Sequence, residues 1–195
     1  AEWAKVLAIE NQTVVARQDD ERVGLLKQPG ITDLGDAKLD EDEEAEDLTA
    51  FVDSNLAVNM VTATARSIND EFQSRLRGVM SRYGDFKAGP LKTVQRCQSK
   101  LENEYQEAAF PKAAKLLDVV RCSVSFNTLE QLLTGYKGLR DYIETTPDSL
   151  ELARVKNGFL DPQAGFRDLK VNVVFHAETV DPHSPLSMVC EVQLM

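Results

Sequence analysis

Two stretches near the end of the chain alternate between apolar and polar positions, and they constrain the fold more than any other feature. The apolar set is Leu169, Val171, Val173 and Phe175 in the first stretch and Met188, Cys190, Val192 and Leu194 in the second. This period of two is typical of half-buried strands. The Pro- and Asp-containing residues between the stretches predict a hairpin loop, so we expect the two strands to pair.

The positions in between are polar. They carry Asp168, Lys170 and Asn172 in the first stretch and Glu191 and Gln193 in the second. Side chains of equal parity on paired strands share one face of the sheet. The pairing therefore predicts a polar face with acids, amides and a lysine, and we expect function to reside there.

Upstream, the sequence predicts two helices, a strand, a helix and another strand. They span about 48–83, a helix opening at Gly89-Pro90, 117–126, a helix from Asn127 or Thr128 to about Tyr142, and 150–156. The first helix has one apolar stripe, and Gly84 is expected to end it as a left-handed residue. This order predicts an α/β (α+β) fold, with a four- to five-stranded mixed sheet flanked by helices.

An acidic segment between Asp33 and Asp53 holds most of the net charge of −10. Such a balance argues against general nucleic-acid binding. A charged run without apolar anchors is disordered in isolation, so we expect residues 1–47 to be an extended acidic arm that does not pack in the core. Within it, Val6–Ile9 and Thr13–Ala16 are candidate short strands. Residues 48–195 form the predicted domain, with the motifs in 89–194.

The cysteines and the chain start bear on location. Cys97, Cys122 and Cys190 lack CxxC spacing and fall at apolar positions, which indicates reduced core thiols in an intracellular, reducing compartment. No run of eighteen apolar residues is present to span a membrane. The chain starts at Ala1 rather than Met, so a removed transit peptide is compatible with it, and cytoplasm and organelle both stay open.

Three cations recur every four residues in the second predicted helix. Lys92, Arg96 and Lys100 would stack on one face, opposite the apolar residues. Like charges at this spacing repel by about a few tenths of a kcal/mol per pair unless an anion neutralises them. A solvated surface and an anion-binding surface both remain open for this face.

Two separated carboxylates, Asp118 and Glu191, accompany these cations together with Arg154 and Lys156. Carboxylates hold Mg²⁺ and cations neutralise polyphosphate, so the set suits phosphoryl transfer. The sequence has no Walker loop and no GxGxxG motif, and neither His176 nor His183 has a partner spaced for zinc or a catalytic triad.

The parity of Asp118 sets a condition on that site. Asp118 shares the parity of Val120, which the alternation turns inward. It reaches the polar face only if it precedes the regular strand or if a bulge intervenes.

From Gly89 to Leu194 the chain resembles the synthetase domain of RelA/SpoT proteins. That family has a helix with Lys, Ser four later and Lys eight later, a metal-binding Asp that opens a strand, and a later Glu-x-Gln strand. The matching positions are Lys92, Arg96 and Lys100, then Leu116-Leu117-Asp118, then Glu191-Val192-Gln193. The resemblance implies a nucleotidyltransferase-like fold, Mg²⁺ on Asp118 and Glu191, and pyrophosphate transfer from ATP to GDP or GTP.

A further family motif is a Lys-Asp pair before a loop ending in Gly-Tyr, whose Tyr stacks on guanine. Lys156-Asn157 and Gly165-Phe166 occupy these places, so the resemblance gives Phe166 the stacking role. The departures are Pro90 for a cation, Lys170 for a His, and Arg121 for a small residue. These variations look similar to a divergent eukaryotic branch with Gly-Pro-x-Lys, Asp-x-x-Arg and Gly-Tyr-Arg-Asp signatures.

Two functions follow from the resemblance, and both remain open. In the first, an enzyme binds its nucleotides through Lys92, Arg96, Lys100, Arg154, Lys156, Phe166, Lys170 and Gln193. In the second, the domain is a catalytically degenerate scaffold or accessory subunit, docked through residues 1–47 into a larger protein assembly that can be organellar.

Overall fold

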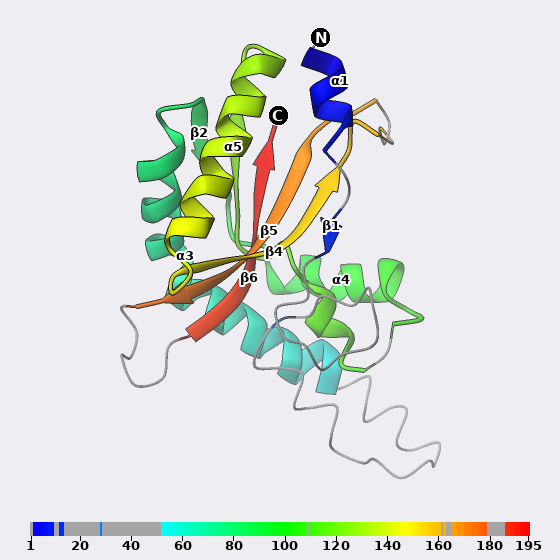
Figure 1. Cartoon of the computed structure of the whole chain (residues 1–195). Helices are drawn as coiled ribbons and strands as arrows, with labels where there is room; N and C mark the ends of the chain where they lie inside the picture. The colour runs from blue at the N-terminus through cyan, green and yellow to red at the C-terminus, as the bar shows by residue number, and fades with distance from the viewer. Residues whose placement is uncertain are drawn as a thin grey trace.

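A mixed sheet with strand order β1-β4-β5-β6-β3-β2 forms the centre of the fold (Figure 1). The computed structural model describes residues 2–9, 12–13, 28, 52–108, 110–160, 162, 165–178 and 186–195. The strands are β1 (Gln12–Thr13), β2 (Asp85–Ala88), β3 (Arg121–Ser125), β4 (Leu150–Asn157), β5 (Leu169–Ala177) and β6 (Leu186–Leu194). β3 and β6 run parallel, and the other neighbours run antiparallel.

The predicted fold class is confirmed, with one strand more than expected. β1 has two residues and includes Thr13 of the candidate strand Thr13–Ala16, whereas β2 was not predicted and has one buried residue, Phe86, among exposed neighbours. Such segments give no alternation long enough to recognise. The predicted hairpin of β5 and β6 is confirmed, with a continuous register from Leu169 opposite Leu194 to Ala177 opposite Leu186.

Helix α3 (Val58–Met80) follows a π-helical turn, η2 (Val52–Ala57). Its apolar stripe is buried as predicted, but the helix ends at Met80. Gly84 is not left-handed. A Cβ on Gly84 would lie 2.6 Å from the carbonyl oxygen of Ser125, so the glycine permits close approach to β3.

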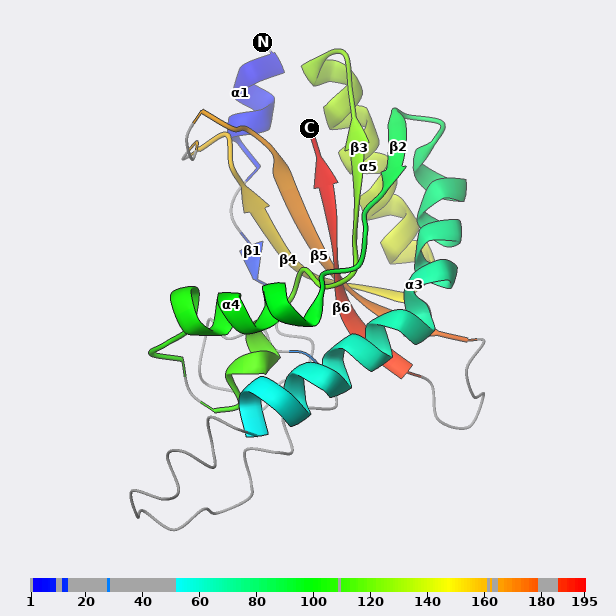
Figure 2. The same ribbon diagram turned by 180° about the vertical axis from the view of Figure 1, so that it is seen from behind.

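The apolar face of the sheet packs against α3 and α5 (Leu129–Thr145), as Figures 1 and 2 show. Thr128 caps α5 as predicted, since its hydroxyl accepts from the backbone N–H of Gln131 at 3.2 Å. Phe72 of α3 meets Phe175 of β5 edge-on, with ring centroids 5.5 Å apart. The opposite face carries Lys170, Asn172, Glu191 and Gln193, as the alternation requires, and beside them a small buried apolar cluster that includes Val174 and Val189.

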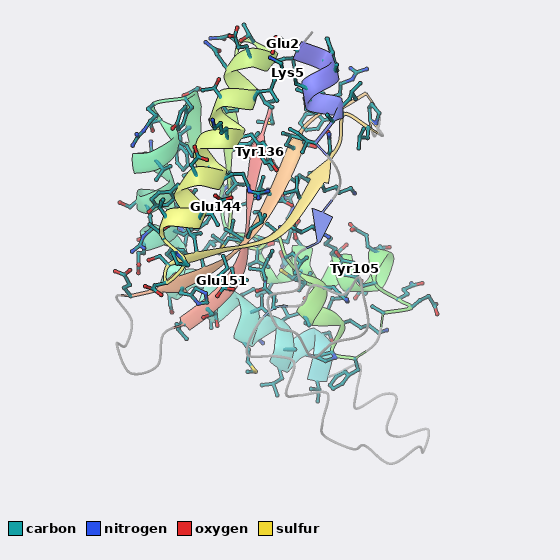
Figure 3. All side chains as sticks on the ribbon, in the orientation of Figure 1. Glu2, Lys5, Tyr105, Tyr136, Glu144 and Glu151 are labelled. Carbon is teal, nitrogen blue, oxygen red and sulfur yellow. The ribbon has the colours of Figure 1, made fainter. Side chains whose placement is uncertain are left out.

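The N-terminal residues pack in the core. Residues 2–7 form a helix, α1 (Glu2–Leu7), where part of a strand was predicted, and Val6 is fully buried. The Asn157 side chain donates to the carbonyls of Val6 and Ile9 at 2.8 and 2.9 Å. α1, which carries Glu2 and Lys5 in Figure 3, lies beside the β4–β5 connection in Figures 1 and 2.

These contacts show that the predicted exclusion of residues 1–47 from the core is wrong for α1. A short helix is held mainly by tertiary packing, which the buried Val6 and the bonds from Asn157 provide here. Most of the remaining residues of that range, with the acidic run, lie outside the described residues, and the division into arm and domain stays a prediction.

All three cysteines are buried free thiols, as predicted. Burial raises the pKa of Cys122 and of Cys190, which keeps these thiols protonated and unreactive. Among the helices of the described residues, none has the length and apolar character needed to cross a membrane.

Candidate functional site

The segment before α4 (Val94–Glu104) is extended and carries Lys92. The backbone N–H of Lys92 donates to the carbonyl of Val119 at 3.1 Å. Thr93 then caps α4, since its hydroxyl accepts from the N–H of Arg96 at 3.3 Å. The predicted helix start at Gly89-Pro90 is therefore wrong. The Thr93 hydroxyl satisfies a free helix N–H, while the segment before it bonds to the residues that lead into β3.

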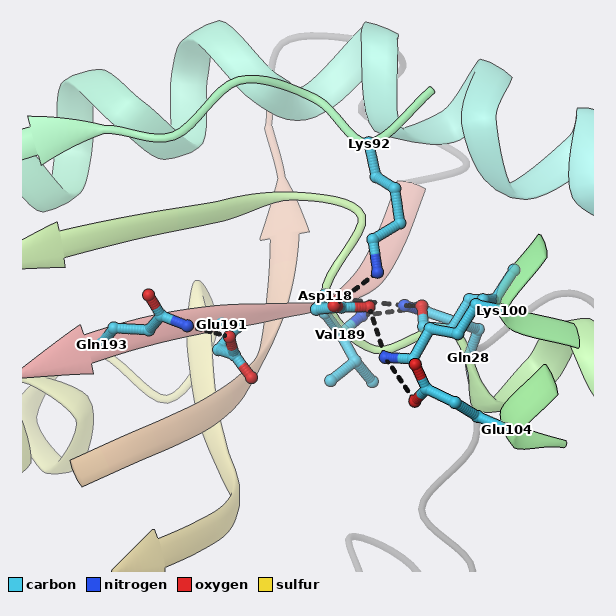
Figure 4. A network of polar contacts seen from close by, with 9 residues as sticks. Gln28, Lys92, Lys100, Glu104, Asp118, Val189, Glu191 and Gln193 are labelled. Atoms are coloured by element: carbon cyan, nitrogen blue, oxygen red, sulfur yellow. Dashed lines mark hydrogen bonds and ion pairs between the residues drawn. The ribbon is translucent and has the colours of Figure 1, made fainter. Parts of the chain in front are cut away.

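Asp118 lies in the turn that precedes β3, outside the regular strand. Because Asp118 precedes the regular strand, the parity of Val120 does not turn it inward. Lys92 Nζ lies 2.5 Å from Asp118 Oδ2, and Lys100 Nζ lies 3.2 Å from Asp118 Oδ1. Figure 4 shows the two lysines approaching the carboxylate from different elements, one before α4 and one within it.

Electrostatics keep Asp118 ionised. Its partial burial acts to raise the pKa, but the hydrogen bond from Lys92 and the charges of Lys100 and Lys92 act more strongly together. The pKa of Asp118 therefore lies below its usual value. Lys100 also lies 3.7 Å from Glu104 and over the ring of Tyr105, which follows α4 in Figure 3.

Glu191 of β6 is the second carboxylate, and it is 6% exposed. Its Oε1 accepts from Gln193 Nε2 at 2.8 Å. Burial, and next the charge of Asp118, raise the pKa of Glu191 above its usual value, although Gln193, Lys170 and Lys100 oppose the shift. Figure 4 shows Glu191 and Asp118 near one another, and the pKa values of the two carboxylates shift in opposite directions.

The sheet register arranges the polar face in cross-strand rows. One row contains Arg154, Asn172, Glu191 and Arg121, and the next contains Lys156, Lys170, Gln193 and Ser123. Directly opposite residues share a face and lie within side-chain reach. The polar face that the sequence predicts therefore extends over four strands.

The candidate cations differ in their surroundings. Lys170 Nζ lies 3.4 Å from Asp168 Oδ2, and Arg154 Nε donates to Asn172 Oδ1 at 2.9 Å. Lys156 and Arg96 are exposed and form no ion pair within the described part of the chain. The predicted basic helix face is thus divided: Lys92 precedes α4, and of the two cations within α4 only Lys100 forms an ion pair with Asp118.

Phe166 is 57% exposed in the connection between β4 and β5. Gly165 before it has φ +81°, a backbone conformation that favours glycine. The guanidinium of the next residue, Arg167, lies 5.9 Å from the ring centroid of Trp3 in α1. The connection thus presents an accessible ring beside α1.

A groove of about 460 Å³ lies between α3 and the segment before α4. Its lining includes Thr62, Arg66, Leu91, Lys92 and Thr93. Lys92 therefore borders a groove that is open to solvent between it and α3.

The donor set fits Mg²⁺. No group of three or more His, Cys, Asp or Glu side chains within the described residues could hold a metal. Mg²⁺ usually binds through one or two carboxylates and keeps its other positions for water and substrate phosphates. Asp118 and Glu191 supply that number, and a cation between them would offset their mutual repulsion.

Three polar groupings were not predicted. Gln28 is buried and bonds to both the N–H and the C=O of Val189. Asn172 is fully buried in the row that contains Glu191. His176 lies between Ser187 and Glu151 at 2.7 and 2.9 Å, two contacts that its position in the sequence did not indicate. Of these groupings, the pairing register of β5 and β6 would have indicated only that His176 lies opposite Ser187 and that Asn172 lies opposite Glu191.

No family model and no curated protein sequence matches this chain. Solved structures do match its fold. Small alarmone synthetase 1 from Bacillus subtilis, bound to its product pppGpp, has a TM-score of 0.52 and 12% identity, covering 79% of this chain and 75% of that chain. Small alarmone synthetase 2 from Bacillus subtilis has a TM-score of 0.52 and 13% identity, covering 70% of each chain.

Proposed function

Because the chain has the fold of the RelA/SpoT-type small alarmone synthetases, we propose that it transfers pyrophosphate from ATP to a guanine nucleotide with the help of Mg²⁺. The observation that carries the proposal is the pairing of Asp118 with Glu191 beside Lys92 and Lys100. Two carboxylates that share a site but bind protons with different strengths suit separate roles in one reaction. The likeness to a synthetase bound to pppGpp supports the choice of acceptor.

In this proposal a hydroxyl oxygen of the guanine nucleotide attacks the β-phosphorus of ATP. The bond between that phosphorus and the oxygen shared with the α-phosphate breaks, and AMP leaves. Glu191, whose raised pKa suits a general base, accepts the hydroxyl proton. Asp118 and Glu191 would hold the Mg²⁺, which supplies charge stabilisation of the transferred group when it is bound.

The cations have separate tasks in the reaction. Lys92 and Lys100 lie at Asp118 and would neutralise the polyphosphate there. Lys170 and Gln193 share a row of the polar face and would bind the acceptor phosphates, while Arg96, Lys156 and Arg154 extend the positive surface. Phe166 would stack on the guanine base.

The test is a transfer assay with labelled ATP and either GDP or GTP, with and without Mg²⁺. We expect AMP and a pyrophosphorylated guanine nucleotide in equal amounts. Glu191→Gln should reduce the rate by about 10²–10³, as expected for the loss of one electrostatic group at the reacting centre. The matched control is Glu151→Gln, which removes the same charge from β4 and keeps an acceptor for His176.

A wild-type protein without turnover for any pair of nucleotides would reject the proposed transfer. Equal losses in Glu191→Gln and Glu151→Gln would show a general effect of charge and reject the role of Glu191.

One observation favours the second function, a nucleotide-binding scaffold. Both carboxylate oxygens of Asp118 are bonded to lysines, so a metal must displace or share these contacts. Isothermal titration with ATP, GTP and GDP separates the functions, since a scaffold that senses nucleotides binds them without turnover and with little dependence on Mg²⁺. A protein partner in a larger assembly belongs to this second function.

A further inference from the structure

Asn172 is a buried polar side chain with incomplete hydrogen bonding. It is 0% exposed on β5, and its Nδ2 has no hydrogen-bond partner within the described part of the chain. A buried donor without a partner destabilises the folded state. Each such group in a native structure calls for an explanation, and a role at a functional site is one of the recognised explanations.

Arg154 fixes the direction of this amide. Its Nε donates to Asn172 Oδ1 at 2.9 Å. Arginine has donors and no acceptor, so turning the amide over would place Nδ2 against a second donor. Arg154 is on β4 and Glu191 is on β6, and both pair with Asn172 in the register. Because Oδ1 is turned to Arg154, the Nδ2 end of the amide is directed away from β4.

We propose that Asn172 is a positioning residue for Glu191, whose carboxylate it holds by donating from Nδ2 so that Glu191 can bind a divalent cation together with Asp118. Directly opposite Cβ atoms in an antiparallel pair lie about 4.5–5.5 Å apart. A rotation of the Glu191 side chain can therefore bring its carboxylate into contact with the Asn172 amide. Gln193 already holds the other part of the carboxylate through Oε1 at 2.8 Å.

Hydrogen bonds of this kind orient the carboxylates that bind metals, and their loss typically costs about 10–100-fold in metal affinity. The inference rests on the metal site of the proposed function and adds a residue that neither the family motifs nor the sequence pattern assigned. It also accounts for the unpartnered amide, which would gain its acceptor when the cation orders Glu191.

The test compares Asn172→Val with Asn172→Thr. The two replacements have nearly the same shape, but the threonine hydroxyl can accept from Arg154 and donate to Glu191. We would titrate each protein with Mn²⁺ alone and follow free Mn²⁺ by electron paramagnetic resonance. The valine variant should bind Mn²⁺ about 10–100-fold more weakly than wild type, and the threonine variant should stay within a few-fold of wild type.

Urea denaturation of the same variants separates positioning from structural support. Valine removes the unpartnered Nδ2 but also the acceptor of Arg154 Nε, two changes of opposite sign, so the free energy of unfolding of its variant should stay close to that of wild type. Wild-type Mn²⁺ affinity in the valine variant would overturn the inference. The inference would also be overturned if the valine variant lost stability and the threonine variant had wild-type stability but weakened Mn²⁺ binding.

Asp118→Asn is the control for the metal site. If wild type and Asp118→Asn bind Mn²⁺ equally, the cation does not use this carboxylate, and the proposed function fails together with the inference. If Asp118→Asn lowers the affinity and Asn172→Val does not, only the role of Asn172 fails.

Discussion

The two faces of the β5–β6 pair are made by the same strands in the same register, yet they contribute to the protein in opposite ways. On one face Val171, Val173 and Phe175 are buried against α3 and α5. On the other face Asn172 and Glu191 are buried as well, but with incomplete hydrogen bonding or a raised pKa. Burial stabilises the first set through the hydrophobic effect and costs free energy in the second.

This difference teaches that burial alone does not identify the stabilising residues of this sheet. A polar group in low dielectric is stabilising only when its hydrogen bonds are complete. Residues that remain buried at a cost are the ones to test for function. Substitutions on each face should therefore separate stability from binding.

The largest effect on stability is expected from Phe175→Ala on the apolar face. Phe175 is fully buried and packs edge-on against Phe72. Removing the ring should lower the free energy of unfolding by about 3–5 kcal/mol, through lost transfer energy and the cavity left behind. Urea denaturation measures the loss. The matched control is His176→Ala, since His176 directly follows Phe175 and lies on the polar face. An equal loss in this variant would contradict the distinction between the faces.

A smaller loss is expected from Gln28→Ala, where a buried polar side chain is fully bonded. The Gln28 amide donates to the carbonyls of Leu116 and Val189 at 2.8 and 3.0 Å and accepts from the Val189 N–H at 2.8 Å. Truncation leaves these backbone groups without partners and should cost about 2–3 kcal/mol.

Gln98→Ala is the control for Gln28→Ala, since the Gln98 side chain donates one hydrogen bond to the Ser54 carbonyl. It should cost about 1 kcal/mol. A loss at Gln28 no larger than that at Gln98 would show that water replaces the amide. The buried hydrogen bonds of Gln28 also contradict the predicted exclusion of residues 1–47 from the core at this residue.

The alternation of apolar residues was sufficient to predict the β5–β6 pair, the buried stripe of α3 and the fold class. Side-chain period is a local property, and tertiary packing preserved it in these elements. The start of α4 was not predictable in the same way, because Gly89-Pro90 and Thr93 are both acceptable helix starts locally. The backbone bond of Lys92 to Val119 decides between them, and that contact is not local.

The candidate site was predictable in composition but only partly in geometry. The positions of Asp118 and Glu191 follow from strand starts and parity, whereas the approach of Lys92 to Asp118 from outside the helix depends on where α4 begins. Gln28 joins Val189 across 161 positions of sequence, a separation that no periodicity reports. The alternation identified Asn172 as a polar residue. That its Nδ2 rather than its Oδ1 is left without a partner depends on the bond from Arg154, which the sequence does not show.

The smallest expected effect is a difference in the pH dependence of stability between Asp118→Asn and Glu191→Gln. The pKa of Asp118 is lowered from 3.8 in the folded state, so its contribution to stability is present above pH 3.8 and is lost as the pH falls. The pKa of Glu191 is raised from 4.5, so its contribution is present below pH 4.5 and is lost as the pH rises through the folded value. Relative to wild type, Glu191→Gln should therefore gain stability as the pH rises from 4 to 7. Relative to wild type, Asp118→Asn should lose stability as the pH rises through 3.8, so this difference lies chiefly below pH 4. Urea denaturation at several pH values measures both slopes, and two curves parallel to wild type would contradict the opposite roles assigned to the carboxylates.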